Sequence, residues 1–175
     1  MSFIFSLWAC VAPGLTTMDE PVNVGKKPEV VEGPYWDECS FNGGDHICDL
    51  FLPTADGGEE RLYDHYGEVI VIDVSAMWCG PCQQLAMEAQ SLQDEYGADG
   101  FQIIEVLIED SGGNAPNRQD LRDWESMGRM ETVPVLGDGS YEVWPYYEAD
   151  WGIPSTTHIG PDGSILYMDQ YVTDP

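Results

Sequence analysis

Residues 69–82 read VIVIDVSAMWCGPC, and this stretch decides how the rest of the chain is arranged. Its first half is short, apolar and rich in β-branched residues, which predicts a buried strand. Its second half ends in two cysteines, and an amphipathic helical pattern follows. The N-terminus of a helix stabilises a thiolate through its free N–H groups and its dipole. We therefore predict a reactive Cys79–Cys82 pair, with Gly80 permitting a tight approach and Pro81 suited to the first helical turn.

The pattern DxxAxWCGPC over residues 73–82 resembles the active-site signature of the thioredoxin family. A CxxC pair alone is weak evidence because zinc sites use the same spacing, so a metal knuckle or an inert buried pair stays open as an alternative. The longer pattern lies on a strand-to-helix junction, which is the local context that a redox pair needs. We therefore expect a dithiol that cycles to an intramolecular disulfide.

The resemblance implies a role for each reactive residue. Cys79, at the helix N-terminus, is expected to be the attacking thiolate, and Cys82, one turn deeper, to resolve the mixed disulfide. Asp73 is the candidate general base for Cys82, because a carboxylate among valines and isoleucines should be desolvated and its pKa raised. The alternative for Asp73 is a strand position that faces solvent.

A second stretch, GIPSTTHIGPDG over residues 152–163, is similar to a run in the TlpA-like (redoxin) branch, which contains extracytoplasmic thiol–disulfide oxidoreductases. Pro154 matches the family's cis proline, which the fold places against Cys79. Ile153 then offers backbone hydrogen bonds to an extended substrate segment. The resemblance also implies that Trp78 packs beside the site. The expected substrate-binding residues are therefore Trp78, Gly80, Pro81, Ile153 and Pro154.

Strand and helix patterns alternate from residue 45 to residue 170. The expected strands are 47–52, 69–74, 101–108, a short extended segment 132–136, and a closing antiparallel pair at 156–159 and 164–168. The expected helices are a short turn at 61–67, then 85–96, 117–130 and a mostly helical return over 141–151. This order predicts an α/β thioredoxin-like fold, with a central mixed sheet and helices on both faces. An extra helix and strand precede Pro154, and the C-terminal helix that usually covers one sheet face is expected to be absent.

The three remaining cysteines divide between an expected bridge and an expected lipid anchor. Cys39 and Cys48 flank a turn-rich loop and are expected to form a structural disulfide in an oxidising compartment. The alternative is a second redox pair or, with His46, a metal site. Cys10 ends an apolar run that resembles a bacterial lipobox, although the run is short and lacks the basic residues of an export signal. An untargeted apolar N-terminus is the alternative to lipidation at Cys10.

These features predict three parts of the chain: a signal or lipobox-like segment 1–10, a flexible linker arm 11–38, and a thioredoxin-like domain 39–175. Tyr35 and Trp36 are expected to dock the end of the arm on the domain. The arm or a partner would then cover the sheet face left open by the missing C-terminal helix. The expected location is extracytoplasmic, in the periplasm or at the cell surface.

The net charge is −26, from 32 acidic and 6 basic residues. Such a charge argues against nucleic acid or an anionic membrane surface as a partner. No run of 18 apolar residues exists, so membrane attachment is expected only through a lipid anchor. We expect a monomer without cofactor or metal, whose partners are a disulfide-containing protein substrate and an upstream electron donor.

The leading functional hypothesis is reduction of disulfides in exported proteins, because Gly-Pro between the cysteines accompanies a reducing potential in this family. A metal-binding module that uses Cys39, Cys48, Cys79 and Cys82, or a non-catalytic interaction protein, is the alternative. The strand 101–108 lacks the lysine that thioredoxins pair with the aspartate and carries Glu105 instead. We expect Glu105 at a partly exposed sheet position rather than in the catalytic site.

Overall fold

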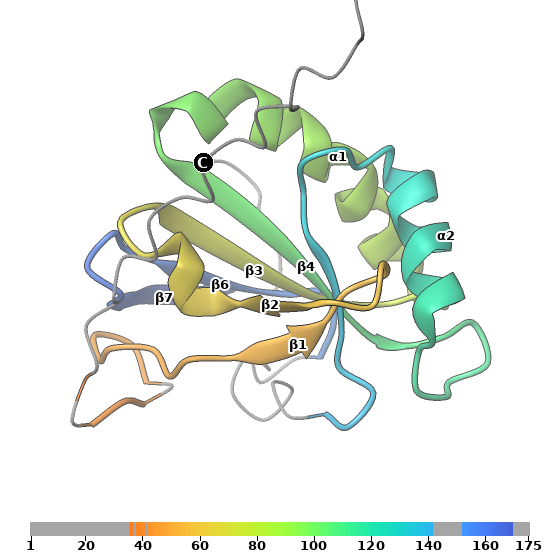
Figure 1. Cartoon of the computed structure of the whole chain (residues 1–175), viewed down its shortest axis with the longest axis horizontal. Helices are drawn as coiled ribbons and strands as arrows, with labels where there is room; N and C mark the ends of the chain where they lie inside the picture. The colour runs from red at the N-terminus through yellow and green to blue at the C-terminus, as the bar shows by residue number, and fades with distance from the viewer. Residues whose placement is uncertain (1–35, 37, 41, 142–151, 170–175) are drawn as a thin grey trace, which may run out of the picture.

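The computed structural model describes residues 36, 38–40, 42–141 and 152–169 (Figure 1). Cys10, the expected lipobox segment and most of the expected linker arm lie outside these residues. The helical return expected over 141–151 also lies outside them, apart from its first residue. No helix in the described part of the chain is long and apolar enough to cross a membrane.

Five strands form the central sheet in the spatial order β5-β4-β3-β6-β7. β3, β4 and β5 run parallel to one another, whereas β6 is antiparallel to β3 and β7 is antiparallel to β6. The bounds are β3 Val69–Ala76, β4 Phe101–Glu109, β5 Val135–Gly137, β6 Ser155–Ile159 and β7 Ile165–Asp169. The predicted mixed sheet is confirmed, including the closing antiparallel pair.

β3 and β4 form the centre of the sheet and are buried on both faces. Their residues pair in register, so that Val71 lies beside Ile103 and Ile72 beside Ile104. Each of these four side chains is at most 3% exposed. Because successive side chains of a strand point to opposite faces, the two pairs belong to two separate layers of core. Parallel strands that are covered on both faces typically have such continuous apolar sequences.

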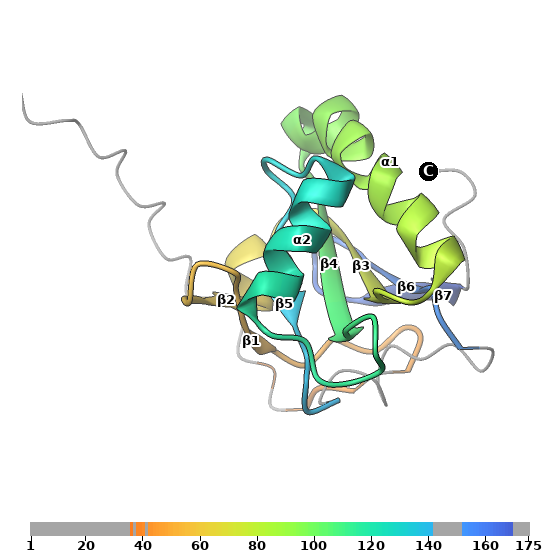
Figure 2. The same ribbon diagram turned by 90° about the vertical axis from the view of Figure 1, so that its right-hand side faces the viewer.

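Two helices, α1 (Gly80–Tyr96) and α2 (Arg118–Gly128), pack side by side on one face of the sheet (Figure 2). α1 ends at the predicted residue, with Gly97 as its C-cap. α2 begins with a capping box, because the Asn117 side chain accepts hydrogen bonds from the N–H groups of the first turn while Asp120 bonds back to the Asn117 N–H. α2 and β5 are the extra helix and strand predicted before Pro154.

The other face is covered by a small hairpin and a short helix. The hairpin consists of β1 (Phe51–Pro53) and β2 (Glu59–Arg61), and the 3₁₀ helix η1 (Leu62–His65) follows. The strand expected over 47–52 is therefore wrong in its first four residues. These residues make other bonds instead: Cys48 is tied to Cys39, and Asp49 accepts hydrogen bonds from the Leu50 and Tyr63 N–H groups.

The N-terminal end of the described chain is held by a disulfide and by an aromatic stack. The structure joins Cys39 and Cys48, with their sulfurs 2.03 Å apart. Trp36 stacks on His46, with ring centroids 3.6 Å apart. Trp36 also lines a small cavity with Ile70, which points away from the face that α1 and α2 cover. Trp36 of the expected arm thus docks on the hairpin side of the sheet, and Tyr35 lies outside the described residues.

Candidate active site

The two cysteines of the predicted redox pair lie at the junction between β3 and α1. The N-cap of α1 is Cys79, and the Cys82 N–H donates a hydrogen bond to Cys79 Sγ over 3.3 Å. The structure shows the pair oxidised, with an S–S bond of 2.07 Å. The helix N-terminus therefore points the Cys82 N–H at Cys79 Sγ, which favours a thiolate there once the pair is reduced.

Exposure differs between the two sulfurs in the direction that the sequence predicts. The Cys79 residue is 5% exposed, whereas Cys82 is fully buried. Trp78, Gly80 and Pro81 surround Cys79 on the exposed side. A client can thus reach Cys79 from solvent, while Cys82 is reached only from within the protein.

The segment before β6 brings a distant part of the chain against the redox pair. The carbonyl oxygen of Ile153 lies 3.9 Å from Cys79 Sγ, across 74 positions of sequence. The Ile153–Pro154 peptide bond is cis, and Pro154 is buried. The structure therefore brings together Cys79, Cys82, Ile153 and Pro154, as the sequence resemblance implies.

Asp73 lies in the middle of β3 and is fully buried. Burial raises the pKa of Asp73 to about 7, while a hydrogen bond from the Ser75 hydroxyl, over 3.1 Å, opposes the shift. By strand alternation Asp73 shares the face of Val71, which packs with Ala89 of α1. The buried carboxylate thus lies on the same sheet face as the helix that carries Cys82.

Glu105 is not at a partly exposed position, so that prediction is wrong. It lies directly opposite Asp73 on β4 and is fully buried. The Trp124 indole N–H of α2 donates to Glu105 Oε2 over 3.0 Å. The continuous apolar run around Glu105 is the same signal that indicated a buried Asp73, and it could have placed Glu105 correctly. Burial, followed by the charge of Asp73, raises the pKa of Glu105 well above its usual value.

The four cysteines named in the metal-binding alternative are all paired in the structure. Cys39 bonds to Cys48 and Cys79 bonds to Cys82, so the sulfurs form two separate disulfides. In the described part of the chain, no group of three or more His, Cys, Asp or Glu side chains is arranged to hold a metal ion.

Comparison with known proteins assigns the family. The model of the AhpC/TSA family matches residues 44–168, which include both halves of the site. The chain belongs to the AhpC/TSA family. In this AhpC/TSA member the redox centre is the thioredoxin-like CxxC pair, and the protein is a thiol–disulfide oxidoreductase.

Relatives of this AhpC/TSA member share its fold and its thiol chemistry. Thioredoxin-like protein YneN of Bacillus subtilis is 26% identical over 70% of this chain and 75% of its own length. Thiol–disulfide oxidoreductase ResA of Oceanobacillus iheyensis is 27% identical over 74% of this chain and 65% of its own. Among solved structures, a Chlorobium tepidum protein assigned as thiol:disulfide interchange protein DsbE superposes with a TM-score of 0.62 and 27% identity, covering 74% of this chain and 85% of its own.

One polar cluster near the redox pair of this AhpC/TSA member was not predicted. Glu109 ends β4 beside Ala76 and accepts hydrogen bonds from the Trp78 indole N–H and the Tyr141 hydroxyl. The two hydrogen bonds span 31 and 32 positions of sequence, so no local sequence pattern predicts them. They fix the exposed Trp78 ring next to Cys79.

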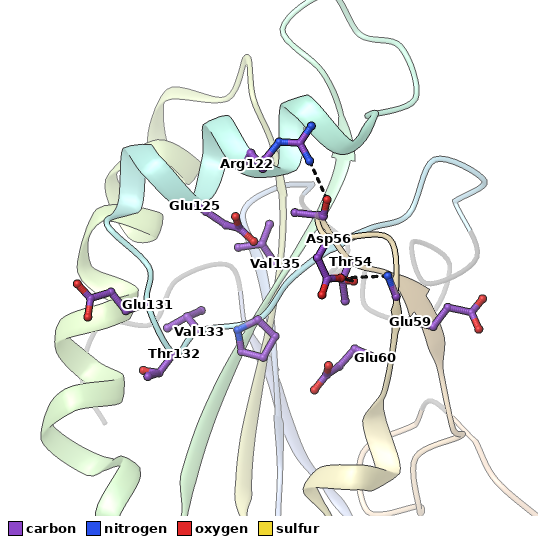
Figure 3. Close-up of a pocket in the computed structure, with 13 residues that line it drawn as sticks. Thr54, Asp56, Glu59, Glu60, Arg122, Glu125, Glu131, Thr132, Val133 and Val135 are labelled. Atoms are coloured by element: carbon purple, nitrogen blue, oxygen red, sulfur yellow. Dashed lines mark hydrogen bonds between the residues drawn. The ribbon is translucent and has the colours of Figure 1, made fainter. Parts of the chain in front are cut away.

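An acidic cavity of about 510 Å³ lies apart from the redox pair, between β2, α2 and the segment before β5 (Figure 3). Arg122 is its one basic residue among the described lining residues, and its guanidinium donates to the Ala55 carbonyl over 2.8 Å. Glu60, Glu125 and Glu131 line the same space. Neither cysteine of the redox pair nor Pro154 borders this cavity, so it plays no part in the chemistry derived for the site.

The raised pKa values predict how stability depends on pH. The unfolded chain releases the protons of Asp73 and Glu105 near pH 4, whereas the folded protein keeps them to higher pH. The stabilisation from Asp73 is therefore complete below about pH 4 and is lost as pH rises through about 7, whereas that from Glu105 is lost only as pH rises through its own raised pKa. Each retained proton changes the unfolding free energy by about 1.4 kcal/mol per pH unit.

A Glu105→Gln variant should accordingly lose less unfolding free energy between pH 5 and pH 7 than the parent, measured by urea denaturation. Glu88 is exposed on α1, so Glu88→Gln is the matched control for removing one charge and should keep the parental slope. Equal slopes of the unfolding free energy against pH in the parent, Glu105→Gln and Glu88→Gln would contradict the prediction.

Proposed function

We propose that the protein reduces disulfides of exported client proteins, with Cys79 as the attacking thiolate and Cys82 as the resolving thiol. The observation that carries this proposal is the asymmetry of the pair: Cys79 keeps an exposed fraction of 5% at a helix N-terminus, whereas Cys82 is fully buried. A nucleophile must reach the client, whereas a resolving thiol needs to reach only Cys79.

The reaction consists of two exchanges. The Cys79 thiolate attacks one sulfur of the client disulfide, forming a Cys79–client disulfide and releasing the other client sulfur as a thiolate that takes a proton from water. Cys82 then loses its proton and attacks Cys79 Sγ, which breaks the mixed disulfide and releases the second client sulfur. The client disulfide is reduced to two thiols, and the Cys79–Cys82 pair is oxidised to the bond that the structure shows.

Asp73 acts as the general base for Cys82 in this proposal. Burial raises the pKa of a thiol, so a buried thiol becomes a thiolate only when a nearby base accepts its proton. Asp73 is suited to that task because burial brings its pKa to about 7, close to neutral pH. Its position on the α1 face of β3 supports the assignment.

The client would bind across the exposed side of Cys79. Trp78, Gly80 and Pro81 supply the surface around the sulfur, and the chain at Ile153 and Pro154 lines it from β6. An extended client segment beside Ile153 would pair with backbone groups, which recognise a main chain irrespective of its sequence.

We place the protein outside the cytoplasm. The Cys39–Cys48 disulfide is typical of an oxidising compartment, and a secreted disulfide oxidoreductase of Mycobacterium tuberculosis shares the fold at 14% identity and a TM-score of 0.57. Lipidation at Cys10, the three-part organisation 1–10, 11–38 and 39–175, a monomeric state and an upstream electron donor remain parts of the proposal.

An insulin-reduction assay with dithiothreitol as electron donor tests the proposed function. We expect the parent to accelerate precipitation of the insulin B chain and Cys79→Ser to match the rate of dithiothreitol alone, because the attacking sulfur is gone. The double variant Cys39→Ser/Cys48→Ser is the control and should retain activity, with folding checked by circular dichroism. Parental activity in Cys79→Ser would remove this proposal.

A further inference from the structure

We infer that Glu105 is a positioning residue for the resolving step: its protonated carboxyl donates to Asp73 and keeps Asp73 the ionised partner that receives the proton of Cys82. This inference deepens the proposed function and rests on it. It concerns a residue that does not touch the reacting sulfurs and acts only through Asp73.

The two carboxyl groups lie side by side on neighbouring strands, on the same face of the sheet. Asp73 and Glu105 are paired residues of neighbouring parallel strands, and both are fully buried. Each of the two groups is close enough to the other to shift its pKa. Two carboxylates have only acceptor atoms, so a hydrogen bond between them requires that one of them carries a proton.

The hydrogen bonds that the described residues make around the pair leave one oxygen of each carboxyl group without a partner. The Ser75 hydroxyl donates to Asp73 Oδ2, and the Trp124 indole donates to Glu105 Oε2. The remaining oxygens, Asp73 Oδ1 and Glu105 Oε1, are buried and have no hydrogen-bond partner among the described residues. A proton held between these two oxygens satisfies both of them.

The ion pairs of the described residues do not compensate a doubly ionised Asp73–Glu105 pair. The ion pairs found in the described part of the chain join Arg61 to Asp49 and His65 to Glu60 and Glu68. Two buried negative charges side by side, without a cation, cost several kcal/mol, so the pair holds a proton at neutral pH.

The surroundings favour Glu105 as the holder of that proton. Burial and the Asp73 charge raise the pKa of Glu105 well above its usual value, whereas the pKa of Asp73 rises only to about 7. The titratable groups on this sheet face include Cys82 and Tyr96 on α1, His158 on β6 and Tyr167 on β7, whose ring stacks on His158. His158 Nε2 lies 3.5 Å from the hydroxyl of Thr156, the residue paired with Asp73.

The proton balance of the resolving step follows. Before the step the pair holds one proton, on Glu105, and carries one negative charge on Asp73. Cys82 transfers its proton to Asp73, and the resulting thiolate forms the bond to Cys79 Sγ while the client sulfur leaves with the electron pair. The pair then holds two protons and is neutral. One of them returns to water before the next cycle.

The test follows the resolving step alone. Reduced protein is converted to a mixed disulfide between Cys79 and a chromogenic aromatic thiol, and release of that thiol is recorded by absorbance across a pH series. Glu105→Met removes the donor while keeping the volume, and Glu105→Gln keeps a neutral donor. The exposed Glu88→Gln serves as the charge control, and urea denaturation confirms that each variant is folded at every pH used.

We expect the pH profile of Glu105→Met to move to higher pH by about one unit, with release roughly tenfold slower at pH 7, because Asp73 loses the donor that stabilises its ionised form. Glu105→Gln should stay within about threefold of the parent, since an amide replaces the protonated carboxyl as donor. Glu88→Gln should match the parent.

The direction of the shift decides the outcome. A move of the Glu105→Met profile to lower pH would mean that Glu105 is an ionised neighbour that repels the Asp73 charge, and an unchanged profile would mean a structural role; either result overturns the inference. Should the parent release the thiol no faster than Cys82→Ser, the proposed function itself fails, and this result is distinct from the other two.

Discussion

In a Cys82→Ser variant, Cys79 is expected to accumulate mixed disulfides with its clients, and turnover should fall to the background rate. Cys79 remains at the α1 N-terminus with its surface open, so the first exchange still proceeds. The hydroxyl at position 82 cannot displace the client, because it does not form a sulfur–sulfur bond. Non-reducing electrophoresis and mass spectrometry of the trapped adducts measure the effect.

The matched control for this experiment is Cys79→Ser. Its remaining sulfur, at position 82, is fully buried and cannot reach a client, so no adducts should form. Adducts of similar amount in both variants would show that either sulfur attacks, and the assignment of the two roles would then be lost. Dithiothreitol should release every trapped client, because the adduct is a disulfide.

Replacing Trp124 by alanine should produce the largest loss of stability of any single change considered. The Trp124 side chain is 1% exposed between α2 and the sheet, and truncation of such a residue costs about 3–5 kcal/mol. The change also removes the indole donor of Glu105 Oε2 inside the core. Urea denaturation should therefore show a much lower midpoint, and Trp124→Phe, which keeps most of the volume, should lose about 1–3 kcal/mol through the missing donor.

A second tryptophan provides an internal comparison. Trp78 also donates its indole N–H to a glutamate, Glu109, but it is 53% exposed. Trp78→Ala should change the unfolding free energy by only about 0.5 kcal/mol, because water replaces the lost contacts. Equal losses at the two positions would contradict the view that burial, rather than the hydrogen bond alone, makes the difference.

Local patterns were sufficient to predict the elements that carry the reactive sulfurs. The apolar run of β3, Gly80 and Pro81 at the start of α1, and the spacing of Cys79 and Cys82 act over a few residues each. Such local features can therefore be recognised in a single sequence. The first residues of the strand expected over 47–52 were predicted wrongly because a disulfide and the bonds to Asp49 override the local pattern.

Glu105 shows where a local interpretation stops. The apolar run around an acidic residue indicates burial, but the sequence does not say which strand and which side chains lie beside it. The structure pairs β4 with both β3 and β5, so Glu105 has neighbours on each side and no access to solvent. The network of Glu109, Trp78 and Tyr141 is likewise made by residues more than 30 positions apart.

The amino-acid sequence by itself determined the chemistry of this protein: two cysteines at a strand-to-helix junction, and an aspartate in the strand before them. Only the tertiary structure decided which further groups meet that chemistry, namely Glu105 at the buried aspartate and Glu109 at the Trp78 ring beside Cys79. The physical reason is the distance along the sequence over which each kind of interaction acts. Helix termini and strand runs follow from bonds within a few residues, whereas the burial and pairing of a carboxyl group depend on which distant strand and helix pack against it.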